Sequence, residues 1–385
     1  MAHISHFGRV LAACCLAALA AFLLAGRTDA TSIRLPLTEL SASSPLVVRG
    51  RVERIESAWN ADRQIDSTVY VRLAEVPRGR LSAGALIPVR VHGGTVDGLT
   101  MVSSEEPTFS VGEDVYLFLG ELQGDAYRLP AGYQGKFDVA GDEASNPAWK
   151  GGLKITDLEE GVLHGRWPAE PDASGKAAAS AVDAAPDTYV YNNAKWFGAN
   201  PMEENLLINV NSNDAGTANG SAEQFRNAIL AAAYTWNNAG ARFAFKYGGL
   251  TGASSWTNDG NNIVYWQNLG QTPTLAETQW WYSNGQILDV DLRFNDYYAW
   301  DVTSRPSSNE PDLQSVATHE LGHWLSLGHD TDRSCPTSTA TMCATYSLGT
   351  LKRSLGMNDI AGIKAIYGAV PQLQRRMYLP LVRRR

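Results

Sequence analysis

Short runs in which apolar and polar residues alternate dominate the first part of the chain. The clearest runs cover residues 47–52, 68–73, 87–91 and 115–119, and Gly, Asp and Ser separate them. A period of two is typical of strands, and turn residues at this spacing are typical of a small sandwich or barrel. We therefore predict a small all-β domain over residues 31–150, which contains no His/Cys cluster and no phosphate-binding loop.

The pattern changes in residues 187–370. Here some segments have apolar residues at the spacing of a helix, and others still alternate like strands. Ser221 and Gln224 form a capping box that begins a helix, and Gly240 ends it. A helix followed by strands and then by two more helices predicts an α+β domain with a mixed sheet. The strands are predicted at 206–210, 243–247, 262–266 and 287–294, and the later helices at about 312–327 and 358–367.

The first of these later helices has a clear apolar face. Its positions repeat at the spacing that places them on one side of a helix, so we expect them to be buried. They are Leu313, Val316, Ala317, Leu321 and Trp324.

The segments between and after the two domains have a different composition. Residues 151–167 mix Gly with polar residues, and residues 168–186 are rich in Ala, Pro, Ser and Asp. This composition is typical of a linker, so we assign residues 151–186 to a linker. If residues 168–186 are exposed, they would be open to cleavage. Residues 371–385 are a C-terminal tail whose apolar piece is too short to span a bilayer.

The first 30 residues read as a signal peptide. Arg9 ends a short n-region, the segment that precedes the apolar part of a signal peptide, and residues 10–24 form the apolar part. Ala30 is a small residue suited to cleavage by signal peptidase. The apolar run is short for a transmembrane span. We therefore expect a secreted, extracellular protein without stable membrane insertion.

The charge of the chain indicates which kinds of partner it can bind, and its cysteines indicate whether it forms disulfides. The chain has 32 Lys plus Arg and 40 Asp plus Glu, a net charge of −8, which becomes −9 once residues 1–30 are removed. A negative chain argues against nucleic acid as a partner. Cys14 and Cys15 leave with the signal peptide, and Cys335 and Cys343 remain. In an exported protein such a pair predicts a disulfide, with two free buried thiols as the alternative.

Three histidines and one glutamate lie within eleven residues, at His319, Glu320, His323 and His329. Helix positions i and i+4 share one face, so His319 and His323 can offer two imidazole nitrogens to one ion. The chain must turn back after the helix to bring in His329. Three protein ligands and one open position are typical of catalytic zinc, Zn2+. The alternative is a helix with three unrelated surface histidines.

The chemistry of such a site is hydrolysis. Zinc held by neutral imidazoles lowers the pKa of a bound water from about 15.7 towards 7. Glu320 lies where it can take that proton and pass it to a leaving amine. Water, base and a polarised carbonyl specify the hydrolysis of an acyl bond, and a peptide is the best candidate for an exported protein. Because the imidazoles must be neutral to bind, activity should fade as the pH falls through about 6.

These residues resemble the metzincin metalloproteases, and within them the matrixin-like secreted bacterial peptidases. The metzincin signature is His-Glu-x-x-His-x-x-Gly-x-x-His, and here Ser326 stands at the glycine position. Met342 looks like the methionine of the turn beneath the zinc. Segments 289–295 and 359–368 are similar to the strand before the active-site helix and to the closing helix of matrixins. The likeness covers residues 187–370. It implies a metzincin-like catalytic domain, zinc as the cofactor and, as an open expectation, structural Ca2+.

Other features depart from the matrixin pattern. Asp330, and the long stretch after His329 that contains Cys335 and Cys343, resemble adamalysin-like relatives. No cysteine lies between Cys15 and Cys335, so the thiolate latch of matrixin precursors is absent. The β domain is similar to an OB-type barrel found beside such proteases. It could restrain the enzyme by steric cover or by a carboxylate, or it could bind substrate or assist folding.

The resulting expectation is a monomeric, secreted zinc-dependent endopeptidase that acts on proteins or peptides. The alternative is a zinc-containing binding module with weak or no turnover that acts through its β domain. The intact Glu320 argues against that alternative, since loss of the base is the simplest way to lose turnover. Hydrolysis of another acyl substrate stays open.

Overall fold

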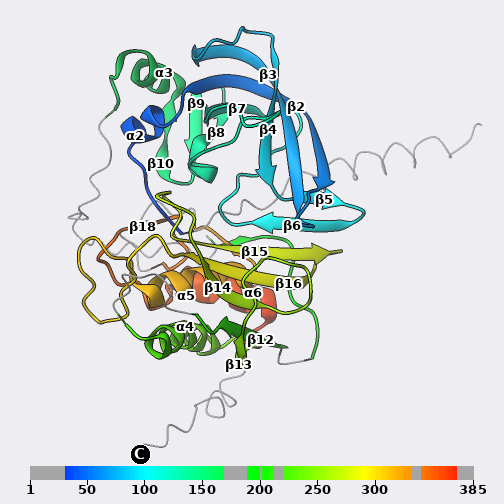
Figure 1. Cartoon of the computed structure of the whole chain (residues 1–385), viewed down its shortest axis with the longest axis vertical. Coiled ribbons are helices and arrows are strands. Elements are labelled where there is room, and N and C mark those ends of the chain that lie inside the picture. Colours follow the sequence, from blue (N-terminus) through cyan, green and yellow to red (C-terminus); the bar gives the residue numbers. More distant parts are fainter. Residues whose placement is uncertain (1–30, 169–188, 200–201, 212–219, 331–339, 371–385) are drawn as a thin grey trace, which may run out of the picture.

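The computed structural model describes two β-rich halves that pack against each other (Figure 1). The upper half in this view comes from the N-terminal residues and the lower half from the residues after about 189. The predicted signal peptide, the predicted C-terminal tail and most of the predicted linker lie outside the described residues. The described ranges are 31–168, 189–199, 202–211, 220–330 and 340–370.

The N-terminal half is built on a seven-stranded antiparallel sheet. Its strand order is β10-β9-β8-β7-β2-β3-β4, and neighbours in the sequence are mostly neighbours in the sheet. All four strands predicted from alternation are present. The strands are β2 (Leu46–Trp59), β3 (Ile65–Arg78), β4 (Leu86–His92), β7 (Asp114–Leu119), β8 (Lys136–Ala140), β9 (Glu143–Asn146) and β10 (Trp149–Lys154).

This half is not all-β, which corrects the sequence analysis, and its strand order does not confirm an OB-type barrel. It also contains α2 (Leu37–Ala42), the 3-10 helix η1 (Gly132–Gly135) and α3 (Ile155–His164). The helix α3 buries Ile155, Leu158 and Val162 at the spacing of one helical face, in the same apolar cluster as Trp149 of β10. Residues 151–164, which we assigned to the linker, therefore belong to the N-terminal domain.

The second sheet is mixed, and both halves contribute strands to it. Its order is β13-β12-β14-β16-β15-β6-β5. The first four strands are parallel, whereas β15, β6 and β5 run antiparallel to their neighbours. The bounds are β12 (Met202–Asn209), β13 (Phe243–Thr251), β14 (Ile263–Gln267), β15 (Ala276–Ser283), β16 (Gln286–Asn295), β6 (Leu99–Ser103) and β5 (Gly94–Val96). The N-terminal domain thus extends the sheet of the second domain at its β15 edge.

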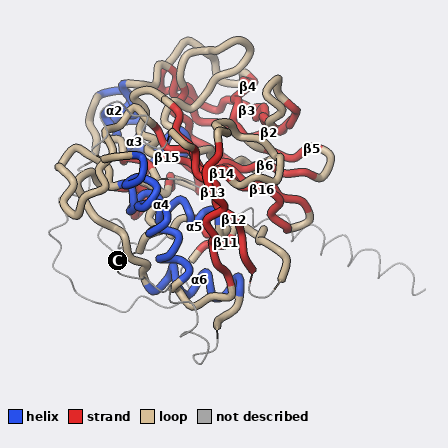
Figure 2. The backbone as a smooth tube through the Cα atoms, turned by 60° about the horizontal axis from the view of Figure 1, so that its bottom comes forward, coloured by secondary structure: helices blue, strands red, loops and turns tan. Residues whose placement is uncertain are grey.

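Among the described residues of the second domain there are three helices, as the α+β prediction requires: α4 (Ala222–Asn237), α5 (Leu313–Trp324) and α6 (Met357–Tyr367). Figure 2 shows them gathered together beside the strands. The capping box of Ser221 and Gln224 is present at the start of α4. The five apolar positions predicted for α5 are all 0 % exposed, so the expected buried face is confirmed.

Two short strand pairs link distant parts of the chain. The strand β1 (Ser32–Ile33) runs parallel to β18 (Thr345–Tyr346), and β11 (Val190–Tyr191) runs antiparallel to β17 (Leu327–Gly328). Among the described residues, no helix combines the length and the apolar composition that crossing a bilayer requires.

Candidate metal centre

The helix α5 carries His319 and His323 one turn apart on a buried face. Asp312 caps its N-terminus, because the Asp312 side chain accepts a hydrogen bond from the backbone N–H of Ser315 at 2.8 Å. Arg353 donates to the same carboxylate through Nε at 2.9 Å. The two histidines are 3 % and 0 % exposed, so their rings face the protein interior.

The chain reverses after α5 through a residue with left-handed backbone geometry. The helix ends at Trp324, earlier than predicted, because Ser326 has a φ of 70°. This geometry costs an L-residue about 1–2 kcal/mol, which explains the glycine in the family signature. The N–H of Ser326 donates to the carbonyl of His323 at 2.7 Å, and the turn continues into β17. His329 follows β17 directly and returns to the two histidines of α5.

The three imidazoles converge through their Nε2 atoms. The Nε2 atom of His319 lies 2.9 Å from that of His323 and 3.0 Å from that of His329. Two nitrogens bound tetrahedrally to one zinc ion at about 2.0–2.1 Å would lie about 3.3 Å apart, so the set fits zinc after a small adjustment. The described residues contain no second group of three or more ligating side chains that converges in this way.

Backbone carbonyls fix the orientation of the first two rings. The Nδ1 atom of His319 lies 2.7 Å from the carbonyl oxygen of Thr341, and that of His323 lies 2.7 Å from the carbonyl oxygen of Leu327. A carbonyl only accepts, so each Nδ1 carries the hydrogen and each Nε2 keeps a lone pair for a metal. Burial and the two neighbouring imidazoles lower the pKa of His319 well below its usual range, which keeps that ring neutral.

Met342 packs directly beneath the histidine-bearing helix. A Cβ atom added to Gly322 would lie 2.2 Å from the sulfur of Met342, so only glycine fits at this point of α5. Met342 is 2 % exposed and carries no group that could replace an imidazole. The structure therefore places Met342 where a supporting side chain is expected.

A carboxylate at the start of α6 holds the turn that contains Met342. Asp359 accepts hydrogen bonds from the backbone N–H groups of Thr341 at 2.7 Å, Met342 at 3.2 Å and Gly356 at 2.7 Å. Burial raises the pKa of Asp359 to about 6. The carbonyl of Thr341 in turn orients His319. Hydrogen bonds therefore connect Asp359 of α6 to the metal centre through Thr341.

We expect Asp359→Ala to lower the free energy of unfolding by about 4 kcal/mol, because three buried N–H groups lose their acceptor. Urea denaturation monitored by tryptophan fluorescence measures this, and zinc affinity should fall as well because His319 loses its support. The exposed Asp62 offers a matched control, and Asp62→Ala should change stability by less than about 0.5 kcal/mol. A similar stability for Asp359→Ala and Asp62→Ala would contradict the role assigned to Asp359.

Glu320 is fully buried beside the triad. Its Oε2 accepts a hydrogen bond from the hydroxyl of Thr278 at 2.8 Å, and its Oε1 accepts one from the backbone N–H of Thr31 at 3.0 Å. Burial raises the pKa of Glu320 to about 7, although both hydrogen bonds lower it. A carboxyl group with this pKa can take up and release a proton near neutral pH.

Sequence reasoning missed the residues that surround Glu320. Thr278 and Thr31 are 42 and 289 positions away from it, and neither stands in a recognisable motif. Tyr133 of η1 donates to the carbonyl of Ala344 at 2.8 Å, and its ring meets that of His329 edge-on at 5.9 Å. Thr278 comes from β15 of the same domain as Glu320, whereas Thr31 and Tyr133 come from the N-terminal domain and reach the site only because the two domains pack together.

Two other residues near the centre have different positions. Tyr346, which lies four residues after Met342, is buried and donates to the carbonyl of Thr350, so it belongs to the core. Cys335 lies outside the described residues. Its disulfide with Cys343 therefore stays a prediction.

Comparison with known families supports the interpretation of this centre. Residues 256–368 match the family described as Matrixin. The chain contains a matrixin-like domain. The matched part of this matrixin-like domain includes β14, β15, β16, α5 and α6, and with them the triad, Glu320 and Met342.

The matrixin-like domain also resembles plant proteins. It is 42 % identical over 71 residues to Metalloendoproteinase 1 of Glycine max, which is 18 % of this chain and 22 % of that protein. It is 38 % identical over 74 residues to Metalloendoproteinase 4-MMP of Arabidopsis thaliana, which is 19 % of this chain and 20 % of that protein. The chain thus spans about a fifth of the length of these relatives.

Proposed function

We propose that this protein is a secreted zinc-dependent endopeptidase that hydrolyses peptide bonds of proteins. The observation that carries the proposal is the convergence of three buried Nε2 atoms, together with the buried carboxyl group of Glu320, the residue that follows His319 in α5. When bound, zinc supplies a Lewis acid that polarises a carbonyl and lowers the pKa of water to about 7. The names of the plant relatives, all metalloendoproteinases, support the same class of reaction.

The protein's own residues perform the remaining steps. His319, His323 and His329 would hold the ion, with two of the rings fixed by backbone carbonyls. Glu320 would accept the proton of the attacking water and deliver it to the leaving amine. The hydroxyl of Thr278, which donates to Glu320 at 2.8 Å, would keep the carboxyl group in position.

The edge of β15 with which β6 pairs in this structure suggests how a substrate would lie. An extended peptide can add a strand to a sheet edge, where main-chain hydrogen bonds provide affinity and side-chain pockets provide specificity. Thr278 in β15 contacts Glu320, so a peptide along this edge would pass the base. The net charge of −8 is consistent with a peptide substrate and does not favour nucleic acid.

Further properties belong to the same proposal. Residues 1–30 have the pattern of a signal peptide, which supports secretion, and an oxidising compartment supports a Cys335–Cys343 disulfide. Mass spectrometry of the exported protein tests both. Structural calcium and a monomeric state are proposed as well, and thermal unfolding with and without calcium, together with the mass in solution, tests them.

The pKa of Glu320 predicts an acid limit on activity. Below its pKa of about 7 the carboxyl group is protonated and accepts no proton, so kcat/KM should fall as the pH decreases. The positive charge of a bound metal lowers a neighbouring carboxyl pKa, which places the midpoint between about 5 and 7. A pH profile with zinc content measured at each point checks this. Constant kcat/KM from pH 8 to pH 4.5 would contradict it.

Chelation tests the proposed function directly. We expect the exported protein to cleave casein or members of a quenched-peptide library, to lose this activity with a chelator and to recover it when zinc is returned. Activity that survives complete zinc removal would contradict the mechanism. A protein that binds zinc but cleaves no peptide, even in variants that release residues 31–33, would favour the binding-module alternative. Cleavage of only a non-peptide ester or amide would indicate another acyl substrate.

A further inference from the structure

The substrate-facing edge of β15 is already covered by two segments of the N-terminal domain. One segment is β6, which pairs antiparallel with β15, for example Ser103 with Gln279. The other is residues 31–33, where Ser32 forms an antiparallel bridge with Thr274 just before β15. In Figure 1 β6 lies along β15 at the boundary of the two halves.

Residues 31–33 are hydrogen-bonded as a short strand on both sides. On one side the N–H of Leu275 donates to the carbonyl of Thr31 at 3.2 Å, and the N–H of Ile33 donates to the carbonyl of Pro273 at 2.9 Å. On the other side β1 runs parallel to β18, which follows the turn of Met342. This segment is thus held between the sheet edge and the chain beyond the metal centre.

The two segments run in the same direction and leave Glu320 between them. Both are antiparallel to the β15 edge, β6 opposite its later residues and Ser32 opposite Thr274. The N–H of Ser104, just after β6, donates to the carbonyl of Thr278 at 2.9 Å. Together they follow the path of one extended peptide that is interrupted beside the base.

The gap between β6 and residues 31–33 lies at Glu320, the residue that must accept a proton from water. The N–H of Thr31 donates to Oε1 of Glu320 at 3.0 Å, and the two residues are 2 % and 0 % exposed. Tyr133 of the N-terminal domain also contacts the ring of His329 edge-on. The N-terminal domain therefore occupies the place from which a water and a substrate carbonyl would reach Glu320.

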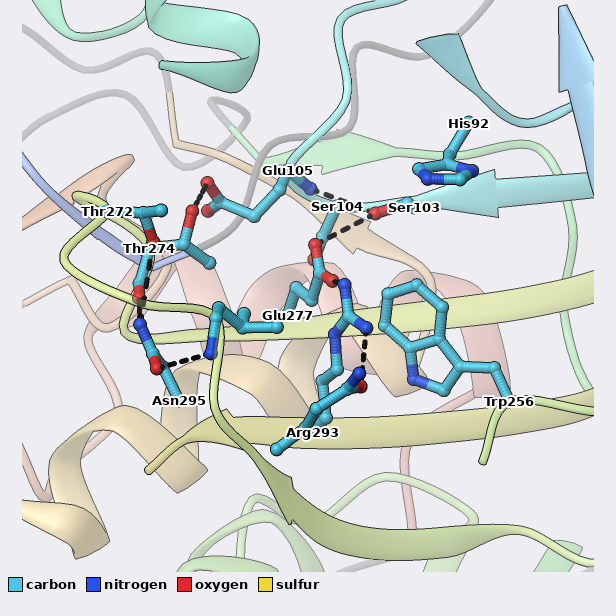
Figure 3. A network of polar contacts seen from close by, with 12 residues as sticks. His92, Ser103, Ser104, Glu105, Trp256, Thr272, Thr274, Glu277, Arg293 and Asn295 are labelled. Carbon is cyan, nitrogen blue, oxygen red and sulfur yellow. Dashed lines mark hydrogen bonds and ion pairs between the residues drawn. The ribbon is translucent and has the colours of Figure 1, made fainter. Parts of the chain in front are cut away.

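A buried carboxyl group fastens the first segment. The hydroxyl of Ser32 lies 2.8 and 2.7 Å from the two oxygens of Glu105, and the hydroxyl of Thr274 lies 2.7 Å from one of them. Figure 3 shows Glu105 beside Thr274 and next to Ser103, Ser104 and Glu277. Glu105 is 4 % exposed, and it joins both covering segments to the second domain.

We propose that the N-terminal domain is an intramolecular inhibitor of the proteolytic site. Residues 31–33 take the places of the three substrate residues after the scissile bond, and β6 takes those of the residues before it. The proposal rests on the proposed function above. If residues 1–30 are removed, the new α-amino group is the Thr31 nitrogen, and the segment then resembles a cleavage product that stays bound beside Glu320.

Release of residues 31–33 in the full-length secreted protein tests this proposal. Ile33→Pro removes the N–H that donates to Pro273, and Ser32→Glu places a second carboxylate against Glu105. The probe is a quenched peptide with one residue before and four after the scissile bond. Such a peptide binds mainly through the residues after the scissile bond, and residues 31–33 leave the corresponding positions when they are released. We expect each variant to raise kcat/KM at least tenfold over wild type.

The matched control is Ser43→Glu, the same substitution at an exposed position in the same domain, and it should stay within twofold of wild type. Combining either release variant with Glu320→Gln should remove the gain. Wild type as active as both release variants would overturn the inhibitor and leave the proposed function intact. No cleavage by any variant, with zinc bound, would overturn the proposed function and the inhibitor with it. If Ile33→Pro fails to fold, Ser32→Glu decides alone.

Discussion

Replacing Glu320 by Gln is expected to lower kcat/KM for a peptide by about 10³–10⁴, at the upper end of what one acid–base group contributes. Gln has nearly the same size, and its carbonyl oxygen can still accept one of the two hydrogen bonds that Thr278 and Thr31 donate. It has no group that takes a proton from water near neutral pH. Steady-state kinetics with a quenched peptide measure the loss.

Two further measurements separate a chemical effect from a structural one. The variant should bind one zinc ion per chain, as wild type does, because the three imidazoles are unchanged. It should also be at least as stable above pH 7, since a neutral amide avoids the cost of burying a carboxylate. Glu223→Gln, an exposed position in α4, is the matched control and should keep full activity. More than a tenth of wild-type activity in Glu320→Gln would exclude it as the base.

Replacing His323 by Ala should abolish zinc binding and activity together. Two imidazoles then remain, and a site with two protein ligands holds zinc far more weakly than one with three. The carbonyl of Leu327 also loses its donor, which costs about 1–3 kcal/mol for a buried group. We expect kcat/KM to fall by at least about 10³ and zinc to be lost on dialysis.

The control for this variant is His164→Ala, an exposed histidine of α3, which should retain zinc and activity. Adding excess zinc to His323→Ala should restore little activity, because the missing ligand also sets the geometry of the open position. A His323→Ala protein that keeps its zinc through dialysis would show that the ion is bound elsewhere.

Local sequence patterns predict the elements that carry the metal ligands. The capping box of α4 and the apolar face of α5 are short-range signals, and the structure reproduces both. The spacing of His319 and His323 follows from helix geometry alone. The return of His329 depends on Ser326, whose positive φ is the feature that the family glycine suggested.

Elements formed by contacts between distant segments were not predictable in the same way. The strand β15 contains the polar run Glu277-Thr278-Gln279, which lacks the alternation of a half-buried strand. These residues are nonetheless buried, because β6 and Glu320 lie against them. The contact between Thr31 and Glu320 spans 289 positions and leaves no local signal.

The extent of the N-terminal domain was misjudged for a related reason. The helix α3 is short and contains Gly161, whose added Cβ would meet the ring of Trp167 at 2.2 Å. Glycine lowers helix propensity, so residues 151–167 read as a linker. Packing against the β domain, which sequence periodicity does not report, outweighs that propensity.

The coordination of zinc in the purified, exported protein tests the central claim most directly. Metal analysis should show one zinc ion per chain. X-ray absorption at the zinc edge should show nitrogen or oxygen ligands at about 2.0–2.1 Å, three of them imidazoles. The spectrum should be unchanged in Glu320→Gln. A protein that is free of metal when made with ample zinc, or a spectrum with sulfur at about 2.3 Å, would contradict the assignment of His319, His323 and His329 as the ligands.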